Sequence, residues 1–228
     1  MNPPTPIAAV APSQGFFPVN RRFARSPSTA CIHRQLGERL RNALKIEARD
    51  FSHALDCFDP CPGRDNSYPE RMVSYYYIQA LARALPGAHV LLEIAIAGES
   101  GREFDNHIDA LVFNDHELVV AEFKVSWAPS HWVHLARDLE RLRGPVAKQI
   151  RTGFAVRGRR PFIFLGTDCW HRGGADAWKA GTKFGKWILP ESMHASERDY
   201  VCVDPDKGRD FDGYYLTWAL IPFREMAA

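Results

Sequence analysis

Two short segments of alternating side chains, on either side of a four-residue turn, constrain the fold of this chain most strongly. Residues 108–113 and 118–126 are rich in β-branched, aromatic and apolar side chains, and each alternates as a half-buried strand does. Residues 114–117 read Asn-Asp-His-Glu and separate the two segments, as a hairpin turn does. The sequence therefore predicts an antiparallel β-hairpin.

Four polar side chains lie at the open end of this hairpin. With two residues at the tip of the turn, the register places Asp109 opposite Glu122 and His107 opposite Lys124. Because strand side chains alternate, we expect all four on one face. The opposite face is apolar throughout: Ile108, Ala110, Val112, Val119, Ala121 and Phe123. Facing carboxylates repel unless a cation lies between them, so a divalent metal with oxygen ligands, beside a lysine, accounts for the arrangement.

The order Asp109, twelve intervening residues, then Glu122-x-Lys124 resembles the PD-(D/E)xK nuclease superfamily, which shares the restriction-endonuclease-like fold. The similarity covers roughly residues 67–167 and includes a preceding helix with an acid at its start and a following helix with a glutamine. Ile108 stands where the family motif has proline. The resemblance implies a metal-dependent nuclease that hydrolyses phosphodiester bonds with Mg²⁺, for which Mn²⁺ can substitute. DNA is expected as the substrate ahead of RNA.

The resemblance also implies roles for individual residues. Asp109 and Glu122 would hold the metal, Glu70 would assist them, and the carbonyl of Phe123 would complete the shell. Lys124 would orient the attacking water or pair with phosphate oxygens. The alternative is a catalytically inactive module of the same fold that binds nucleic acid or protein.

Two candidate residues belong to predicted helices. A helix starts at residues 67–70, with proline at its first position and Glu70 in its first turn, and runs to Leu85. Glu70 lies on the apolar stripe of that helix, and its alternative role is a helix-dipole acid. Gln149 belongs to a helix that restarts after Gly144, where the family places a glutamine that contacts the catalytic acid or the substrate. Its alternative is an ordinary surface glutamine.

The remaining patterns predict an α/β fold. Apolar spacing indicates helices over residues 35–55 and 130–143, and apolar runs indicate strands over residues 89–97, 161–167 and 214–222. Residues 168–212 are turn-rich, and their tryptophans are expected to pack in the core. The order over residues 67–167 is helix, strand, strand, strand, helix, strand, or αβββαβ. This order predicts a mixed central sheet flanked by helices, with a restriction-endonuclease-like core.

Composition and charge suit a soluble protein that binds nucleic acid. Hydrophobic residues make up 46% of the chain, and no apolar run approaches the twenty or so residues that cross a bilayer. Residues 1–30 contain six prolines and predict a flexible arm before one domain over residues 31–228. Residues 1–49 and 137–160 each carry a net charge of +6 and flank residues 50–136, which carry −8. Ordinary solvated helix faces would give similar bands.

The cysteines favour a reduced setting. Their number is odd and their positions are scattered, which predicts a cytoplasmic protein, although a disulfide stays open. No second ligand pair follows Cys57 and Cys61 at zinc-site spacing, so no zinc site is expected. The five cysteines are Cys31, Cys57, Cys61, Cys169 and Cys202. No membrane partner is expected, a homodimer is left open, and the sequence does not separate endonuclease from exonuclease.

Overall fold

A six-stranded sheet forms the centre of the fold, in a computed structural model that describes residues 29–57, 70–95, 107–125, 132–153, 158–193, 197–205 and 212–223. The strand order is β1-β2-β3-β4-β8-β7. The strands are β1 His89–Ala95, β2 His107–Phe113, β3 Glu117–Lys124, β4 Arg160–Cys169, β7 Glu197–Asp204 and β8 Tyr214–Pro222. β3 and β4 run parallel and the other neighbours antiparallel. The predicted mixed sheet is confirmed.

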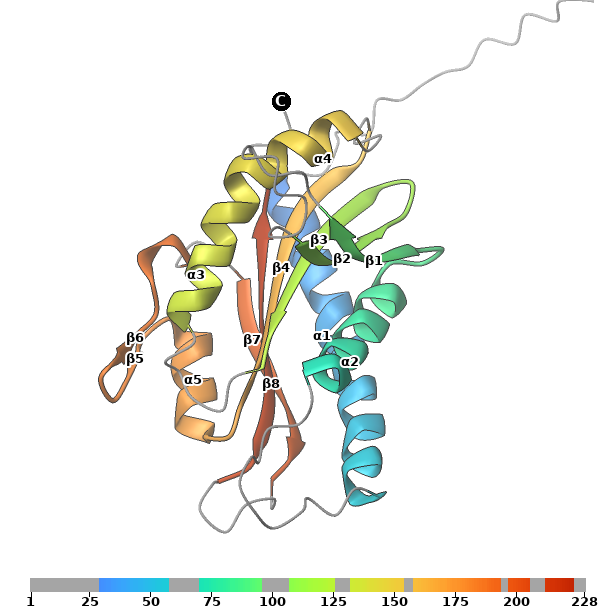
Figure 1. Ribbon diagram of the computed structural model, residues 1–228. Coiled ribbons are helices and arrows are strands. Elements are labelled where there is room, and N and C mark those ends of the chain that lie inside the picture. Colours follow the sequence, from blue (N-terminus) through green and yellow to red (C-terminus); the bar gives the residue numbers. More distant parts are fainter. Residues whose placement is uncertain are drawn as a thin grey trace, which may run out of the picture.

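Helices cover both faces of the sheet (Figure 1). α1 Thr29–Cys57 and α2 Glu70–Ala84 lie on one face. α3 Trp132–Arg141, α4 Ala147–Gly153 and α5 Arg172–Ala180 lie on the other, and a kink over Leu142–Val146, where Gly144 is not helical, separates α3 from α4. A small hairpin of β5 Lys183–Phe184 and β6 Trp187–Ile188 and a 3₁₀ turn, Glu191–Met193, follow α5. The order α2, β1, β2, β3, α3, α4, β4 agrees with the predicted αβββαβ order except that two helices, α3 and α4, precede β4.

The amphipathic helix predicted over residues 35–55 forms, and it is longer than expected. Leu36, Leu44 and Leu55 are fully buried against α2 and the sheet, as their helical spacing requires. α1 begins at Thr29, so residues 29 and 30, assigned to the predicted arm, are helical. Residues 1–28 lie outside the described residues.

The hairpin between β2 and β3 has the predicted register. Phe113 pairs with Leu118, and the ladder continues to Ala110 and Ala121. The amide of Asn114 donates to the carbonyl of Glu117 at 3.0 Å, which closes the turn. The side-chain Oδ1 of Asn114 accepts the backbone N–H groups of His116 and of Glu117, the first residue of β3, both at 2.8 Å. This local bonding is why an asparagine starts the turn.

Residues 168–212 contain more regular structure than the sequence predicted. α5 and β7 both fall in this segment. The glycine pair in α5 weakens its helix propensity, and acidic residues on β7 hide its strand pattern. Burial acts to raise the pKa of Asp199, but hydrogen bonds from Lys179 and Arg41 lower it below its ordinary value, so the charge is accommodated by partners far away in sequence. Trp170 and Trp178 are buried, as predicted, whereas Trp187 is half-buried.

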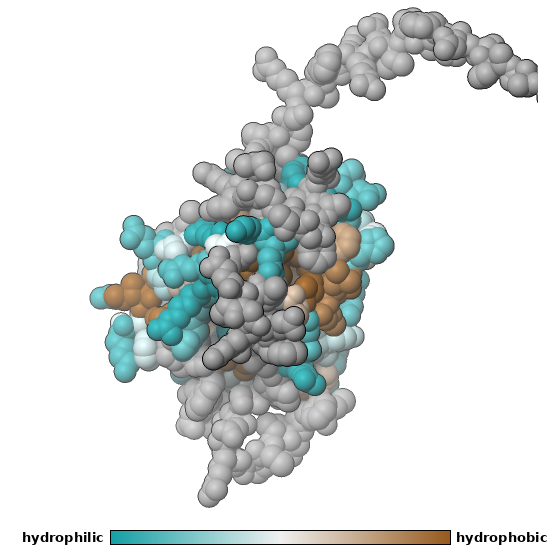
Figure 2. All heavy atoms as spheres, turned by 45° about the horizontal axis from the view of Figure 1, so that its top comes forward, coloured by the Kyte–Doolittle hydropathy of each residue, from teal (hydrophilic) through white to brown (hydrophobic). Residues whose placement is uncertain are grey.

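Several large hydrophobic side chains of the described residues are exposed. Figure 2 shows hydrophobic surface on the left, beside the β5–β6 hairpin, and on the right, the side on which Figure 1 draws β1. Ile188 of β6 is 68% exposed, and Leu91 and Leu92 of β1 are 40% and 56% exposed. None of the helices in the described ranges is long and apolar enough to cross a membrane.

Candidate active site

The site is built on the contact between α2 and the centre of the sheet. The hydroxyl of Tyr77 lies 2.6 Å from the carbonyl oxygen of Thr167 and 2.7 Å from that of Thr217, so it bonds α2 to β4 and β8. Its ring stacks on Phe123 with centroids 5.5 Å apart. Gly166 pairs with Phe123 in the ladder, and a Cβ there would lie 2.9 Å from the Tyr77 ring. These contacts hold Phe123, and with it the end of β3, in one position.

Asp109 lies where β2 separates from β3. The ladder between these strands ends at Ala110 and Ala121, while β3 continues to pair with β4 as far as Lys124. The Oδ2 atom of Asp109 accepts the backbone N–H of Phe123 at 2.7 Å. The carboxylate therefore bridges the two strands beyond the point where their backbones stop pairing, and it satisfies an amide that the ladder leaves unpaired.

The expectation that Asp109 and Glu122 share one face of the hairpin is wrong. Ile108, which was expected opposite, is buried with Leu111 on the α3 side. Asp109 instead lines a cavity with Phe123 on the α2 side. The two acids therefore meet from the two sides of the gap between the strands. The irregularity coincides with a gap in the pairing of β1 with β2, which passes from Leu92–Ala110 to Ile94–Ile108 without a Glu93–Asp109 pair.

Glu93 occupies the skipped position and has a left-handed backbone conformation, with φ of 48°. Successive strand residues normally point to opposite faces, yet Leu92 and Glu93 both line the cavity. A left-handed conformation costs a non-glycine residue about 1–3 kcal/mol. At Glu93 and Asp109 the side chains do not alternate between the two faces of the sheet. The prediction that Asp109 and Glu122 share a face assumed this alternation.

Glu122 is an almost completely buried carboxylate. It is 2% exposed, and burial followed by the charge of Asp109 raises its pKa to about 8, against smaller lowering contributions from Arg141 and Lys124. Arg141 Nη2 donates to Glu122 Oε1 in a short ion pair. The ion pair favours the ionised carboxylate, but the larger effect of burial leaves the pKa raised. The cation that the facing acids require is thus supplied from α3 by Arg141.

Lys124 and Asp138 complete the cluster. Lys124 Nζ lies 3.8 Å from Asp138 Oδ2, and Arg141 Nη2 lies 3.7 Å from Asp138 Oδ1. Asp138 Oδ2 is buried and has no hydrogen-bond donor among the described residues. Three carboxylates, of Asp109, Glu122 and Asp138, therefore face two cations. The sequence reasoning missed Asp138 and Arg141, although their i,i+3 spacing in a helix after the motif was a usable signal.

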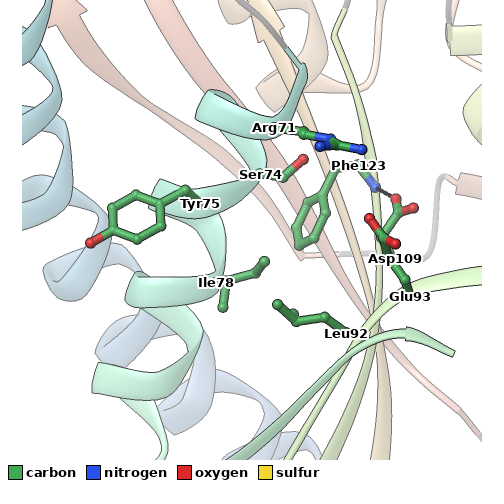
Figure 3. A pocket seen from close by; sticks show the side chains of 8 residues that line it. All are labelled: Arg71, Ser74, Tyr75, Ile78, Leu92, Glu93, Asp109 and Phe123. Carbon is green, nitrogen blue, oxygen red and sulfur yellow. Dashed lines mark hydrogen bonds between the residues drawn. The ribbon is translucent and has the colours of Figure 1, made fainter.

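A cavity of about 450 Å³ opens beside Asp109, between α2 and β1. Its apolar wall is formed by Ile78, Leu92 and Phe123. Figure 3 shows Arg71 from α2 pointing toward the carboxylates of Glu93 and Asp109 at one end of the cavity. The cavity gives Asp109 access to a ligand from the α2 side.

The other predicted site residues are placed as follows. Glu70 is the first residue of α2, and its side chain lies outside what the structure describes. The apolar stripe that follows it is confirmed, because Val73, Tyr77 and Leu81 are buried. Gln149 is half-buried on α4. The roles of Glu70 and Gln149, and of the Phe123 carbonyl as a metal ligand, stay predictions.

The donor set suits a hard divalent cation in part. Among the described residues, no group of three or more His, Cys, Asp or Glu side chains is arranged to hold a metal ion. Mg²⁺, however, is usually bound by one or two carboxylates together with waters and substrate phosphates. The pair Asp109 and Glu122 and the unbonded buried oxygen of Asp138 fit such an ion.

A second cluster with nucleophilic chemistry, Cys169 with His171 and Asp212, is not activated. Burial raises the pKa of the Cys169 thiol to about 11, so the thiol stays protonated near neutral pH. Its Sγ donates to the backbone carbonyl of His171 at 3.3 Å rather than to the imidazole. This geometry is that of a buried structural cysteine.

Comparisons of the chain with protein-family models, with curated proteins and with solved structures found no match. No relative therefore assigns roles to the acid cluster. The chemistry of the site follows from its own geometry.

Proposed function

We propose that the protein is a metal-dependent nuclease that hydrolyses phosphodiester bonds, with DNA preferred over RNA. The observation that carries the proposal is the pair of interacting carboxylates, Asp109 and Glu122, at the point where β2 and β3 separate. Lys124 follows Glu122 by two residues on β3. This set supplies oxygen ligands for Mg²⁺ or Mn²⁺ and a cation for phosphate within one cluster.

Each residue has a distinct part in the proposed chemistry. Asp109 and Glu122 would hold the metal, which supplies a water of lowered pKa and stabilises negative charge on the phosphate. The amide of Phe123 fixes one carboxylate oxygen of Asp109, so the orientation of this ligand is set before metal binds. Lys124 lies on the same face of the regular strand β3 as Glu122, because the residues are two apart. There its ammonium group would orient the water or bind a phosphate oxygen.

The non-catalytic alternative is favoured by one observation. Arg141 already neutralises Glu122, and a buried carboxylate with a permanent arginine partner is a common structural element. In this alternative the fold binds nucleic acid or protein and does not cleave. Metal-dependent turnover distinguishes the two functions.

The test is a cleavage assay with a matched set of variants. Supercoiled plasmid, linear duplex, single-stranded DNA and RNA are incubated with Mg²⁺ or Mn²⁺, or with chelator. Wild type is expected to cleave at least one substrate only with metal, and Asp109→Asn and Glu122→Gln are expected to abolish cleavage. Glu117→Gln is the control, because Glu117 is a buried glutamate at the other end of β3, paired with Arg39 at 2.6 Å. Binding without cleavage of any substrate would support the non-catalytic alternative.

A further inference from the structure

Arg141 contacts three different groups around the acid cluster. Its Nη1 donates to the carbonyl oxygen of His107 at 2.7 Å, and its Nη2 binds Glu122 and lies 3.7 Å from Asp138. The arginine side chain is 22% exposed, whereas that of Glu122 is 2% exposed. Arg141 is therefore the solvent-accessible member of the ion pair, and it fills the position of a counter-ion to the buried acid.

A divalent cation on Glu122 and the guanidinium of Arg141 would compete for the same carboxylate. Two cations on one buried carboxylate repel at short range, and the repulsion is strong where water is excluded. A guanidinium that leaves the carboxylate needs another anion. Its planar fork matches phosphate as well as it matches carboxylate. When nucleic acid binds together with the metal, it brings a phosphate to the cluster.

We propose that Arg141 is an exchangeable counter-ion of this site. In the metal-free protein Arg141 is bonded to Glu122, and it transfers to a phosphate oxygen of the nucleic acid when Glu122 binds the metal. This inference rests on the proposed nuclease function. It gives Arg141 two opposite effects, because the residue opposes metal binding and favours substrate binding.

Metal affinity tests the first effect. Mn²⁺ is titrated into chelator-treated wild type and Arg141→Gln, and binding is followed by calorimetry. Removing the competing cation is expected to tighten Mn²⁺ binding about tenfold or more, as expected for loss of a charge-assisted hydrogen bond. Arg83→Gln is the matched control. It removes an arginine from another buried glutamate, Glu47, at 2.9 Å and changes the net charge equally, so Mn²⁺ affinity should stay within about twofold of wild type.

Nucleic-acid affinity tests the second effect. Fluorescence anisotropy of a labelled oligonucleotide is measured with Ca²⁺ in place of Mn²⁺, over a range of salt concentrations. Arg141→Gln should bind more weakly, and the slope of log affinity against log salt should fall by about one phosphate contact. Arg141→Lys keeps the charge and loses the fork, so it should fall between wild type and Arg141→Gln in both titrations. A purely structural arginine would weaken both kinds of binding when replaced.

If Arg141→Gln is unstable, thermal melting with and without Mn²⁺ still tests the inference. Its melting temperature in chelator should be lower than that of wild type and should rise more on addition of Mn²⁺, because the metal replaces the lost counter-ion. Equal Mn²⁺ affinity in wild type and Arg141→Gln would overturn the inference and leave the nuclease proposal standing. Absence of Mn²⁺ binding in both proteins, with no cleavage by wild type, would overturn both. Tighter Mn²⁺ binding by Arg141→Gln than by wild type would support the exchange directly.

Discussion

Replacing Glu122 with glutamine should change the pH dependence of stability more than the stability itself. Glutamine keeps the size of the side chain and its ability to accept a hydrogen bond, but it does not ionise. In wild type, burial and Asp109 raise the pKa of Glu122 from 4.5 to about 8. The folded protein therefore holds this proton more tightly than the unfolded chain does. The free energy of unfolding is highest below the unfolded pKa and falls as the pH rises toward 8.

The magnitude follows from the two pKa values. Each factor of ten in proton affinity is worth about 1.4 kcal/mol, so the full effect of raising the pKa from 4.5 to about 8 approaches 5 kcal/mol. Between about pH 5 and pH 8, linkage gives a relative gain of about 3–4 kcal/mol for Glu122→Gln over wild type. Above about pH 8 the difference should be constant.

Urea unfolding followed by tryptophan fluorescence, in chelator and at intervals from about pH 5 to pH 9, measures this difference. Val120→Ala serves as the control, because it removes buried volume two residues earlier on β3 and titrates nothing, so its cost should not vary with pH. A Glu122→Gln difference that is flat across the range would show that the pKa is not raised. A difference that grows only as the pH falls below about 5 would show that the pair with Arg141 outweighs burial, and the electrostatic reasoning would be refuted.

Three further variants test separate parts of the site. Gly166→Ala should cost about 1–3 kcal/mol in urea unfolding, because the added methyl group meets the rings of Tyr77 and Phe123. Tyr77→Phe should cost about 1–2 kcal/mol in the same measurement, because its hydroxyl bonds buried carbonyl oxygens, while the ring stack is kept. Lys124→Ala should lower the single-turnover cleavage rate about 10²-fold or more with little change in nucleic-acid affinity, because the loss lies in the transition state. A Lys124→Ala rate equal to that of wild type would remove the lysine from the mechanism.

The hairpin was predictable because residues close together in the sequence determine it. A period of two in residues 108–113 and 118–126 and an asparagine turn between them fix the register, and the structure has that register as far as Ala110 and Ala121. The direction of Asp109 was not predictable in the same way. It accompanies an irregular pairing with β1 at Glu93, which has a left-handed backbone, and nothing in the residue type of Glu93 indicates such a conformation.

The identity of the cation between the acids depends on contacts between distant segments. The sequence reasoning required a positive charge near Asp109 and Glu122 and assigned it to a metal alone. The structure supplies Arg141, nineteen residues from Glu122 in sequence, and the distance depends on how α3 packs across the sheet. Helix phase places Arg141 and Asp138 on one side of α3, but the pairing of that side with β3 is a tertiary feature.

Parallel titrations of Mn²⁺ binding and of cleavage rate test the central claim most directly. Wild type should bind Mn²⁺ in calorimetry, and the cleavage rate of its best substrate should saturate over the same range of metal concentration. Asp109→Asn should lose both the binding and the cleavage while keeping a cooperative unfolding transition. Cleavage that persists in chelator, cleavage by Asp109→Asn at the wild-type rate, or Mn²⁺ binding without cleavage of any substrate would contradict the assignment of Asp109 and Glu122 as the metal-dependent catalytic centre.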